Sequence, residues 1–176
     1  TYLAERLLDC SFAEFALVRD SLMPPDPELM NRLWAIQNDA TVTASTRFRA
    51  GLALATFSPS HANWSDKNAT FVTELLLTAN LDDQRELRNF LRPIASKLLA
   101  PLQASFRNES ARDRVREAAA VALADYAQDD SLLLARLISD ATAPQFEVLY
   151  SALTNTSEMR GATDGVLRQI VRQPPA

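Results

Sequence analysis

The sequence predicts an all-α fold built from repeated helical units, and three observations carry this prediction. Only three glycines occur among 176 residues, whereas the strong helix formers Ala and Leu are abundant, and this leaves little room for tight β-hairpins or phosphate-cradling loops. Apolar residues recur at helical spacing in successive stretches. An ungapped shift of 69 positions also aligns the chain with itself, placing Arg47 on Arg116 and Leu54 on Leu123.

The same shift relates residues over roughly the first sixty positions. It aligns Arg19 with Arg88, Pro24 with Pro93, Leu29 with Leu98, Leu33 with Leu102 and Phe57 with Tyr126. A fixed period is typical of repeat proteins, and half of it, about 35 residues, is the size of a two-helix unit. We therefore predict a single domain over 1–173, with sub-repeats at about 1–69 and 70–138, a degenerate third copy over 139–173, and a linker or exit at 174–176.

Capping residues and prolines predict the helix boundaries in order. Ser11, with Glu14 three positions later, is a capping box that begins the second helix. The cluster Pro24-Pro25-Asp26-Pro27 ends that helix and begins the third. The segment 46–57 is small or apolar on most faces, which predicts a helix buried between neighbours. The expected helices are about 2–8, 12–22, one after Pro27 that carries Leu29, Leu33 and Ile36, then 46–57, 69–78, 83–91, 94–106, 111–127, 131–139, 144–153 and 165–172.

Charge and composition argue against several classes of protein. The formal net charge is −4, whereas a nucleic-acid binder needs a basic footprint. The single cysteine, Cys10, cannot form an internal disulfide, and no apolar run approaches the ~20 residues that span a bilayer. Lone His61 is not enough for a zinc site. We expect a cytoplasmic protein that binds no metal or other cofactor, and a chain without an initial methionine that is part of a longer protein.

Two segments resemble a known helical repeat. Asp113-Arg114-Val115-Arg116 and the small apolar residues up to Leu123 resemble the second helix of a HEAT repeat, and 46–54 resembles it less closely, because no Asp precedes its Arg. In that family the small residues let helices approach closely, and the Arg reaches a partner in a neighbouring unit. The resemblance implies a right-handed superhelix (solenoid) of about four stacked helix pairs.

A second resemblance covers most of the chain. The stretch 47–55 with Trp64, then Leu91-Arg92-Pro93, then 123–130, is similar to the HEAT-like helical segment of large multidomain bacterial proteins that often carry a serine/threonine protein kinase module. This implies an accessory region of a signalling protein. The chain has no glycine-rich loop, His-Arg-Asp or Asp-Phe-Gly motif, so any kinase activity would lie outside it.

The candidate partner-binding residues are Arg85, Arg88, Arg92 and Trp64. The three arginines share one helix face by their spacing, which permits a basic patch or an ordinary solvated face. Trp64 is either an exposed anchor or a residue that pins a long loop. Arg47 and Arg116 are interpreted as inter-repeat links, with a concave groove for acidic partners as the alternative. The acids Asp125, Asp129 and Asp130 are read as a helix-capping turn rather than a cation site.

These observations predict a non-catalytic protein-interaction or scaffold module that recognises a protein partner. Two alternatives stay open at this point. One is a HEAT-like nucleic-acid-binding or DNA-base-processing enzyme, which the acidic net charge disfavours. The other is a structural spacer between domains, expected if no surface patch is unusually apolar or charged. The sequence predicts neither the partner nor the oligomeric state.

Overall fold

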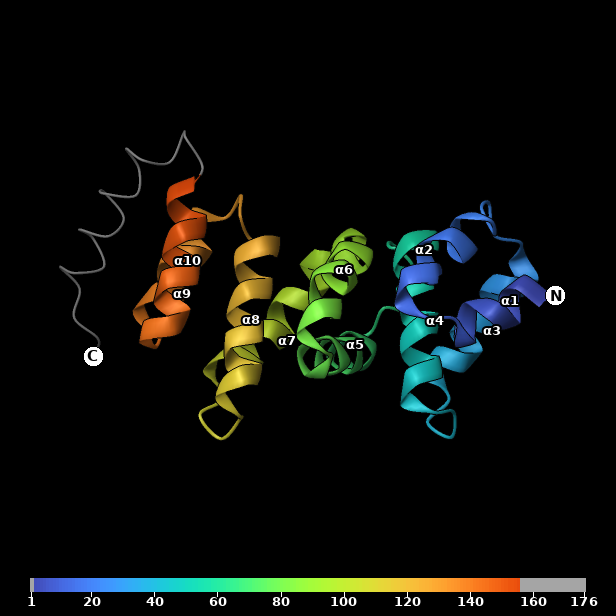
Figure 1. The fold of residues 1–176 in the computed structure, drawn as a ribbon, viewed down its shortest axis with the longest axis horizontal. Coiled ribbons are helices and arrows are strands. Elements are labelled where there is room, and N and C mark those ends of the chain that lie inside the picture. The colour runs from blue at the N-terminus through green and yellow to red at the C-terminus, as the bar shows by residue number, and fades with distance from the viewer. Residues whose placement is uncertain (1, 156–176) are drawn as a thin grey trace. The chain divides into compact units, whose positions relative to one another are not determined.

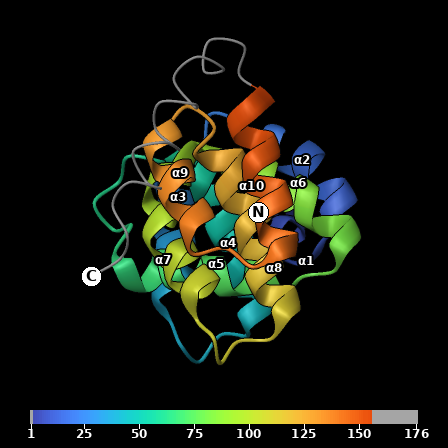
Figure 2. The same ribbon diagram turned by 90° about the vertical axis from the view of Figure 1, so that its left-hand side faces the viewer.

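The computed structural model describes residues 2–155, and every regular element in this range is helical (Figures 1 and 2). This confirms the all-α prediction for the described part of the chain. The predicted helix near 165–172 and the predicted linker at 174–176 lie outside the described residues. The elements are α1 (Tyr2–Asp9), α2 (Phe12–Asp20), α3 (Pro27–Asn38), α4 (Ala44–Phe57), α5 (Asp66–Thr78), α6 (Leu81–Leu91), a 3₁₀ turn (Arg92–Ile94), α7 (Ala95–Arg107), α8 (Asp113–Tyr126), α9 (Ser131–Ser139) and α10 (Ala143–Asn155).

The helices begin where the sequence places capping residues. Ser11 precedes α2, and its N–H donates to the Glu14 carboxylate, which is the reciprocal half of the predicted capping box, while its hydroxyl donates to the same carboxylate. Asp26 caps α3 by accepting the Leu29 N–H at 2.7 Å. Asp130 caps α9 in the same way, which confirms the structural reading of the acidic turn. These bonds satisfy amides that have no partner inside the helix.

The chain divides into two compact units, Thr1–Leu98 and Leu99–Ala176, and the boundary lies within α7. In the first unit α4 packs against α1, α3 and α6. Its segment 50–55 is buried throughout, so the prediction of a helix enclosed by neighbours is confirmed. Only small side chains allow backbones to approach α4 from several directions, and this explains the run of Ala and Gly there.

In the second unit α10 packs against both α8 and α9 (Figure 1). The buried side chains follow helical spacing on each element, which is the pattern of amphipathic helices around one core. They include Ala119, Ala120 and Leu123 from α8, Leu134 and Leu137 from α9, and Leu149 and Leu153 from α10. The predicted boundary between sub-repeats, at 69/70, falls inside α5, so the sequence period does not mark an edge between helices there.

Candidate functional site

The loop between α4 and α5 is held by an aromatic cluster around Trp64. The Trp64 side chain is only 7% exposed, and its Nε1–H donates to the Ser58 carbonyl at 3.1 Å. Its ring meets Trp34 edge-on with centroids 5.3 Å apart, and His61 stacks on Trp34 at 4.9 Å. The prediction of Trp64 as an exposed partner-binding anchor is therefore wrong. Its large apolar ring is buried and its one polar atom is satisfied, so it pins the loop.

The three arginines of the predicted basic patch lie among acidic residues of the same segment. Arg85 and Arg92 are exposed and Arg88 is half-buried. The same segment, 81–92, carries three acids, Asp82, Asp83 and Glu86, so its formal charge is zero. Arg92 lies beyond the end of α6 in the 3₁₀ turn, where the helical spacing of the other two no longer applies. A face of this kind is typical of a solvated helix.

Arg47 and Arg116 make the same contact in the two halves of the chain. Arg47 Nε donates to the Gln37 carbonyl at 3.3 Å, and Arg116 Nε donates to the Phe106 carbonyl at 3.5 Å. Gln37 and Phe106 are themselves 69 positions apart, so donor and acceptor both follow the repeat. Each arginine satisfies a carbonyl near the end of the preceding helix. These bonds lie within a sub-repeat, which corrects the expectation that they reach into the next unit.

The environments of the two arginines differ beyond that bond. The Arg47 guanidinium carbon lies 3.9 Å from the centroid of the Phe71 ring in α5, so Arg47 does contact the following sub-repeat through a cation–π interaction. Within residues 2–155 no ring lies over Arg116 in this way. In the 69-residue register that relates Arg47 to Arg116, Phe71 corresponds to Asp140, which cannot supply a ring. Arg116 instead lies 3.8 Å from the Asp113 carboxylate in α8.

Arg116 borders a cavity of about 190 Å³ in the second unit. This cavity, which we call the Arg116 cavity, lies between the first turns of α8 and α10. Asp113, Glu117, Thr142 and Pro144 are exposed, so the cavity opens to solvent, whereas 16% of the Arg116 side chain is accessible. Its walls are lined by Asp113, Arg116, Glu117, Thr142, Pro144 and Gln145.

Gln145 is the buried polar residue of this cavity. It is 1% exposed, and its Oε1 accepts the Thr142 N–H at 2.9 Å, which reproduces the reciprocal half of a capping box at the start of α10. Its Nε2 has no hydrogen-bond partner among the described residues. A buried amide donor without a partner costs free energy, so it favours an acceptor or a π face brought close to it.

Sequence reasoning missed the Arg116 cavity. One feature of the sequence points toward it in retrospect, the Thr142-Ala143-Pro144-Gln145 pattern of a helix start. This feature does not predict a cavity alone, because the space depends on how the first turn of α10 lies against α8.

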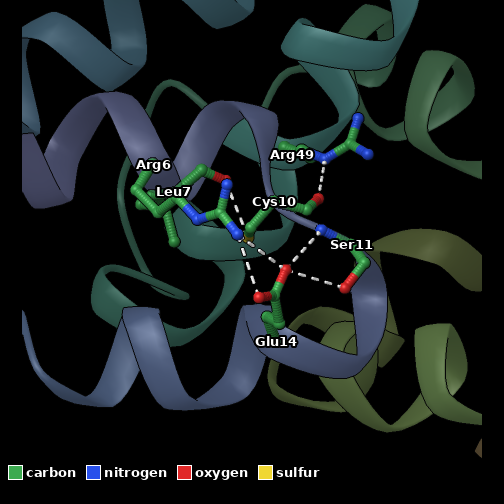
Figure 3. Close-up of polar contacts among 6 residues, drawn as sticks. All are labelled: Arg6, Leu7, Cys10, Ser11, Glu14 and Arg49. Atoms are coloured by element: carbon green, nitrogen blue, oxygen red, sulfur yellow. Dashed lines mark hydrogen bonds and ion pairs between the residues drawn. The ribbon is translucent and has the colours of Figure 1, made fainter.

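A cluster of polar contacts holds the α1–α2 corner of the first unit (Figure 3). The Glu14 carboxylate accepts both hydrogen bonds of Ser11, and its two oxygens also accept from Arg6 Nη2 at 2.9 and 3.0 Å. Arg49 reaches from α4 and donates from Nε to the Cys10 carbonyl at 2.9 Å. These contacts satisfy the Ser11 N–H at the start of α2 and the Cys10 carbonyl after α1, so we interpret the corner as structural.

Glu14 is expected to titrate at low pH. The two Ser11 hydrogen bonds, followed by Arg6, lower the pKa of its carboxyl below the usual value. A lowered folded-state pKa means that the charged form stabilises the corner above the unfolded pKa, and this contribution is lost as the pH falls through the folded-state pKa. We predict a depressed Glu14 pKa by carboxyl ¹³C NMR titration, raised in both Ser11→Ala and Arg6→Met. A titration at the usual value near 4.3 in the unaltered chain would contradict the prediction.

Cys10 is expected to be unreactive in the folded protein. It is 1% exposed, its Sγ–H donates to the Leu7 carbonyl at 3.8 Å, and burial raises the pKa of its thiol. Since the thiolate is the reactive form, labelling requires opening of the corner. We predict that a thiol-reactive dye labels the native protein at least ~100-fold more slowly than the urea-unfolded chain. Equal rates would show that the corner is open in solution.

In the part of the chain from 2 to 155, no helix has both the length and the apolarity needed to span a bilayer. The same range contains no cluster of three or more His, Cys, Asp or Glu side chains placed to hold a metal ion.

Comparison with known proteins finds no similar family, protein or structure. No family model matches the chain, and neither a curated protein nor a solved structure matches it significantly. The arguments for function therefore come from the geometry of the chain itself.

Proposed function

We propose that this chain is a non-catalytic protein-interaction module built from helical repeats. The observation that carries the proposal is the paired contact of Arg47 with Gln37 and of Arg116 with Phe106, which repeats at the same spacing as the sequence. Repeat proteins of stacked helix pairs expose long surfaces that bind partner segments. A right-handed HEAT-like superhelix of about four helix pairs is the arrangement that we propose for the whole chain.

The superhelix is tested by small-angle X-ray scattering. A compact chain of 176 residues has a radius of gyration of about 16 Å. A stack of helix pairs is elongated, so we expect a value of roughly 18 Å or more and an asymmetric distance distribution. A radius of gyration near 16 Å with a symmetric distribution would contradict the proposed stack, and it would leave the helical elements unchanged.

The binding function is tested by selecting peptides from a random display library on the folded chain. We expect a shared sequence motif to emerge, and a soluble peptide with that motif to compete with the displayed one. The urea-unfolded chain, immobilised at the same density, is the control and should select no common motif. Failure to enrich any motif on the folded chain, or equal enrichment on the unfolded control, would contradict a protein-interaction function.

We also propose that the chain is an accessory region of a larger bacterial signalling protein, such as one that carries a serine/threonine kinase module. The support is the similarity of 47–55, Trp64, 91–93 and 123–130 to such helical segments. Sequencing the native reading frame on both sides of the chain tests this proposal. A kinase module in that frame is the expected result, and a frame that encodes only further helical repeats would contradict it.

A further inference from the structure

We propose that the Arg116 cavity binds an aromatic side chain of a partner protein, with a basic residue beside it in the partner. This inference rests on the proposed protein-interaction function and names the chemistry of its site. It is carried by the comparison of two arginines that occupy the same place in the repeat. Arg47 has a phenylalanine ring on its guanidinium, and Arg116 has an open cavity.

Arg47, the repeat equivalent of Arg116, already contacts an aromatic ring. Both arginines use Nε to hold the preceding helix end, so both guanidinium groups are fixed in orientation. In the first copy the plane of Arg47 is covered by Phe71 at 3.9 Å. A guanidinium stacks well on an aromatic face because its charge is delocalised and weakly hydrated. A ring brought to Arg116 would restore the contact that the chain itself makes at Arg47.

The Arg116 cavity has the size of an aromatic ring, and no described residue fills it. An apolar cavity of about 150 Å³ accommodates benzene, so a cavity of about 190 Å³ has room for one phenyl or phenol ring. No residue between 2 and 155 supplies that ring. Residues 156–176 contain no Phe, Tyr or Trp. The ring must therefore come from outside residues 1–176, and we assign it to a partner protein.

The charged residues at the rim of the Arg116 cavity favour a basic residue in the partner. Asp113 and Glu117 are exposed carboxylates at the rim, one helical turn apart on α8. They disfavour a phosphate or another small anion beside Arg116, although two helix starts meet there. They favour a lysine or arginine next to the inserted ring, since opposite charges across a rim steer association and select partners. The unpartnered Nε2 of Gln145 adds a donor that an inserted π face can accept.

The test uses short peptides and the full chain labelled with ¹⁵N. The probe is Ac-Gly-Phe-Lys-Gly-NH₂, titrated while amide and side-chain signals of α8 and α10 are followed. The comparison peptides replace Phe by cyclohexylalanine, which has a similar size without a π system, or replace Lys by Glu. We expect saturable binding on the order of 1 mM, at least fivefold weaker for each comparison peptide, with shifts centred on Arg116 and Gln145.

Three variants make the assignment specific. Arg116→Lys keeps the charge and loses the planar group, so we expect at least a fivefold loss of affinity for the Phe-Lys peptide. Arg47→Lys is the matched control, because it makes the same exchange at the equivalent position and should leave affinity unchanged. Glu117→Lys changes only an exposed rim residue, and it should reverse the preference so that the Phe-Glu peptide binds more tightly.

Three results would overturn the inference: no saturable binding up to 10-fold above the expected constant, equal affinity for the Phe and cyclohexylalanine peptides, or equal affinity of wild type and Arg116→Lys. If the Arg116→Lys variant does not fold, the test depends on Glu117→Lys alone. The inference then requires that this variant bind the Phe-Glu peptide more tightly than the Phe-Lys peptide. Peptides selected by display that bind Arg116→Lys as tightly as wild type would leave the interaction function standing and remove this site. An empty display selection would remove the function itself.

Discussion

Replacing Leu54 or Leu123 by alanine is expected to lower the free energy of unfolding by about 2–5 kcal/mol. The two leucines are 69 positions apart and both are fully buried, Leu54 in α4 and Leu123 in α8. Truncation removes the transfer free energy of the lost methyl groups and leaves a cavity between packed helices. Urea denaturation followed by far-UV circular dichroism measures the loss for each variant. Leu81→Ala is the control, because Leu81 is 68% exposed and should change stability by less than about 0.5 kcal/mol.

The same variants test whether the two units unfold together. Both tryptophans of the chain, Trp34 and Trp64, lie in the first unit, so tryptophan fluorescence follows that unit alone. In a stack of repeats, stability is shared between neighbours. The proposed superhelix therefore predicts that Leu123→Ala lowers the fluorescence midpoint as well as the dichroism midpoint. A fluorescence midpoint that stays at the wild-type urea concentration would count against the stack, whereas a wild-type dichroism midpoint would contradict the burial of Leu123.

Replacing Gly51 by valine is expected to destabilise the protein by about 3 kcal/mol, and replacing it by alanine by about 1 kcal/mol. A Cβ atom at this position would come within 3.0 Å of Val72 Cγ2 and 3.1 Å of Gln37 Oε1. Gln37 is fully buried, so its side chain has little room to move away from the new Cβ atom. In a free helix Gly to Ala gains about 1 kcal/mol, which the crowding more than offsets here.

A double-mutant cycle isolates the crowding from other effects. Val72→Ala removes the methyl group that the new Cβ would strike, so Gly51→Ala should cost less in the Val72→Ala background than in the wild type, with a coupling of about 1 kcal/mol. Ala120 occupies the equivalent position in α8 and is also fully buried. Ala120→Gly is the matched control and should cost about 1 kcal/mol from helix propensity alone. A Gly51→Ala variant that is more stable than wild type would refute the close approach of α3 and α5 to α4.

The helical content and most helix boundaries follow from the sequence alone, because they depend on interactions over one or two turns. The Ser11–Glu14 box, the Asp26-Pro27 start of α3 and the Asp130 cap of α9 were each predictable from residue type and spacing. The equivalence of Arg47 and Arg116 was predictable from the 69-residue period. Their acceptors were not, because a bond to the carbonyl ten residues upstream exists only once two helices fold against each other.

Burial and the cavity were decided by tertiary structure. Trp64 has the same residue type and loop context whether it projects outward or packs on Trp34, and only the path of the loop selects the buried position. The spacing of Arg85, Arg88 and Arg92 predicts a shared face, and the acids that balance their charge are visible in the same segment, but the turn that removes Arg92 from the helix is not. The Arg116 cavity lies between the first turns of α8 and α10, so its space depends on how these two helices pack against each other. Short-range propensities determined the helices of this protein, whereas the space left between side chains of distant segments depends on their packing, which no local pattern encodes.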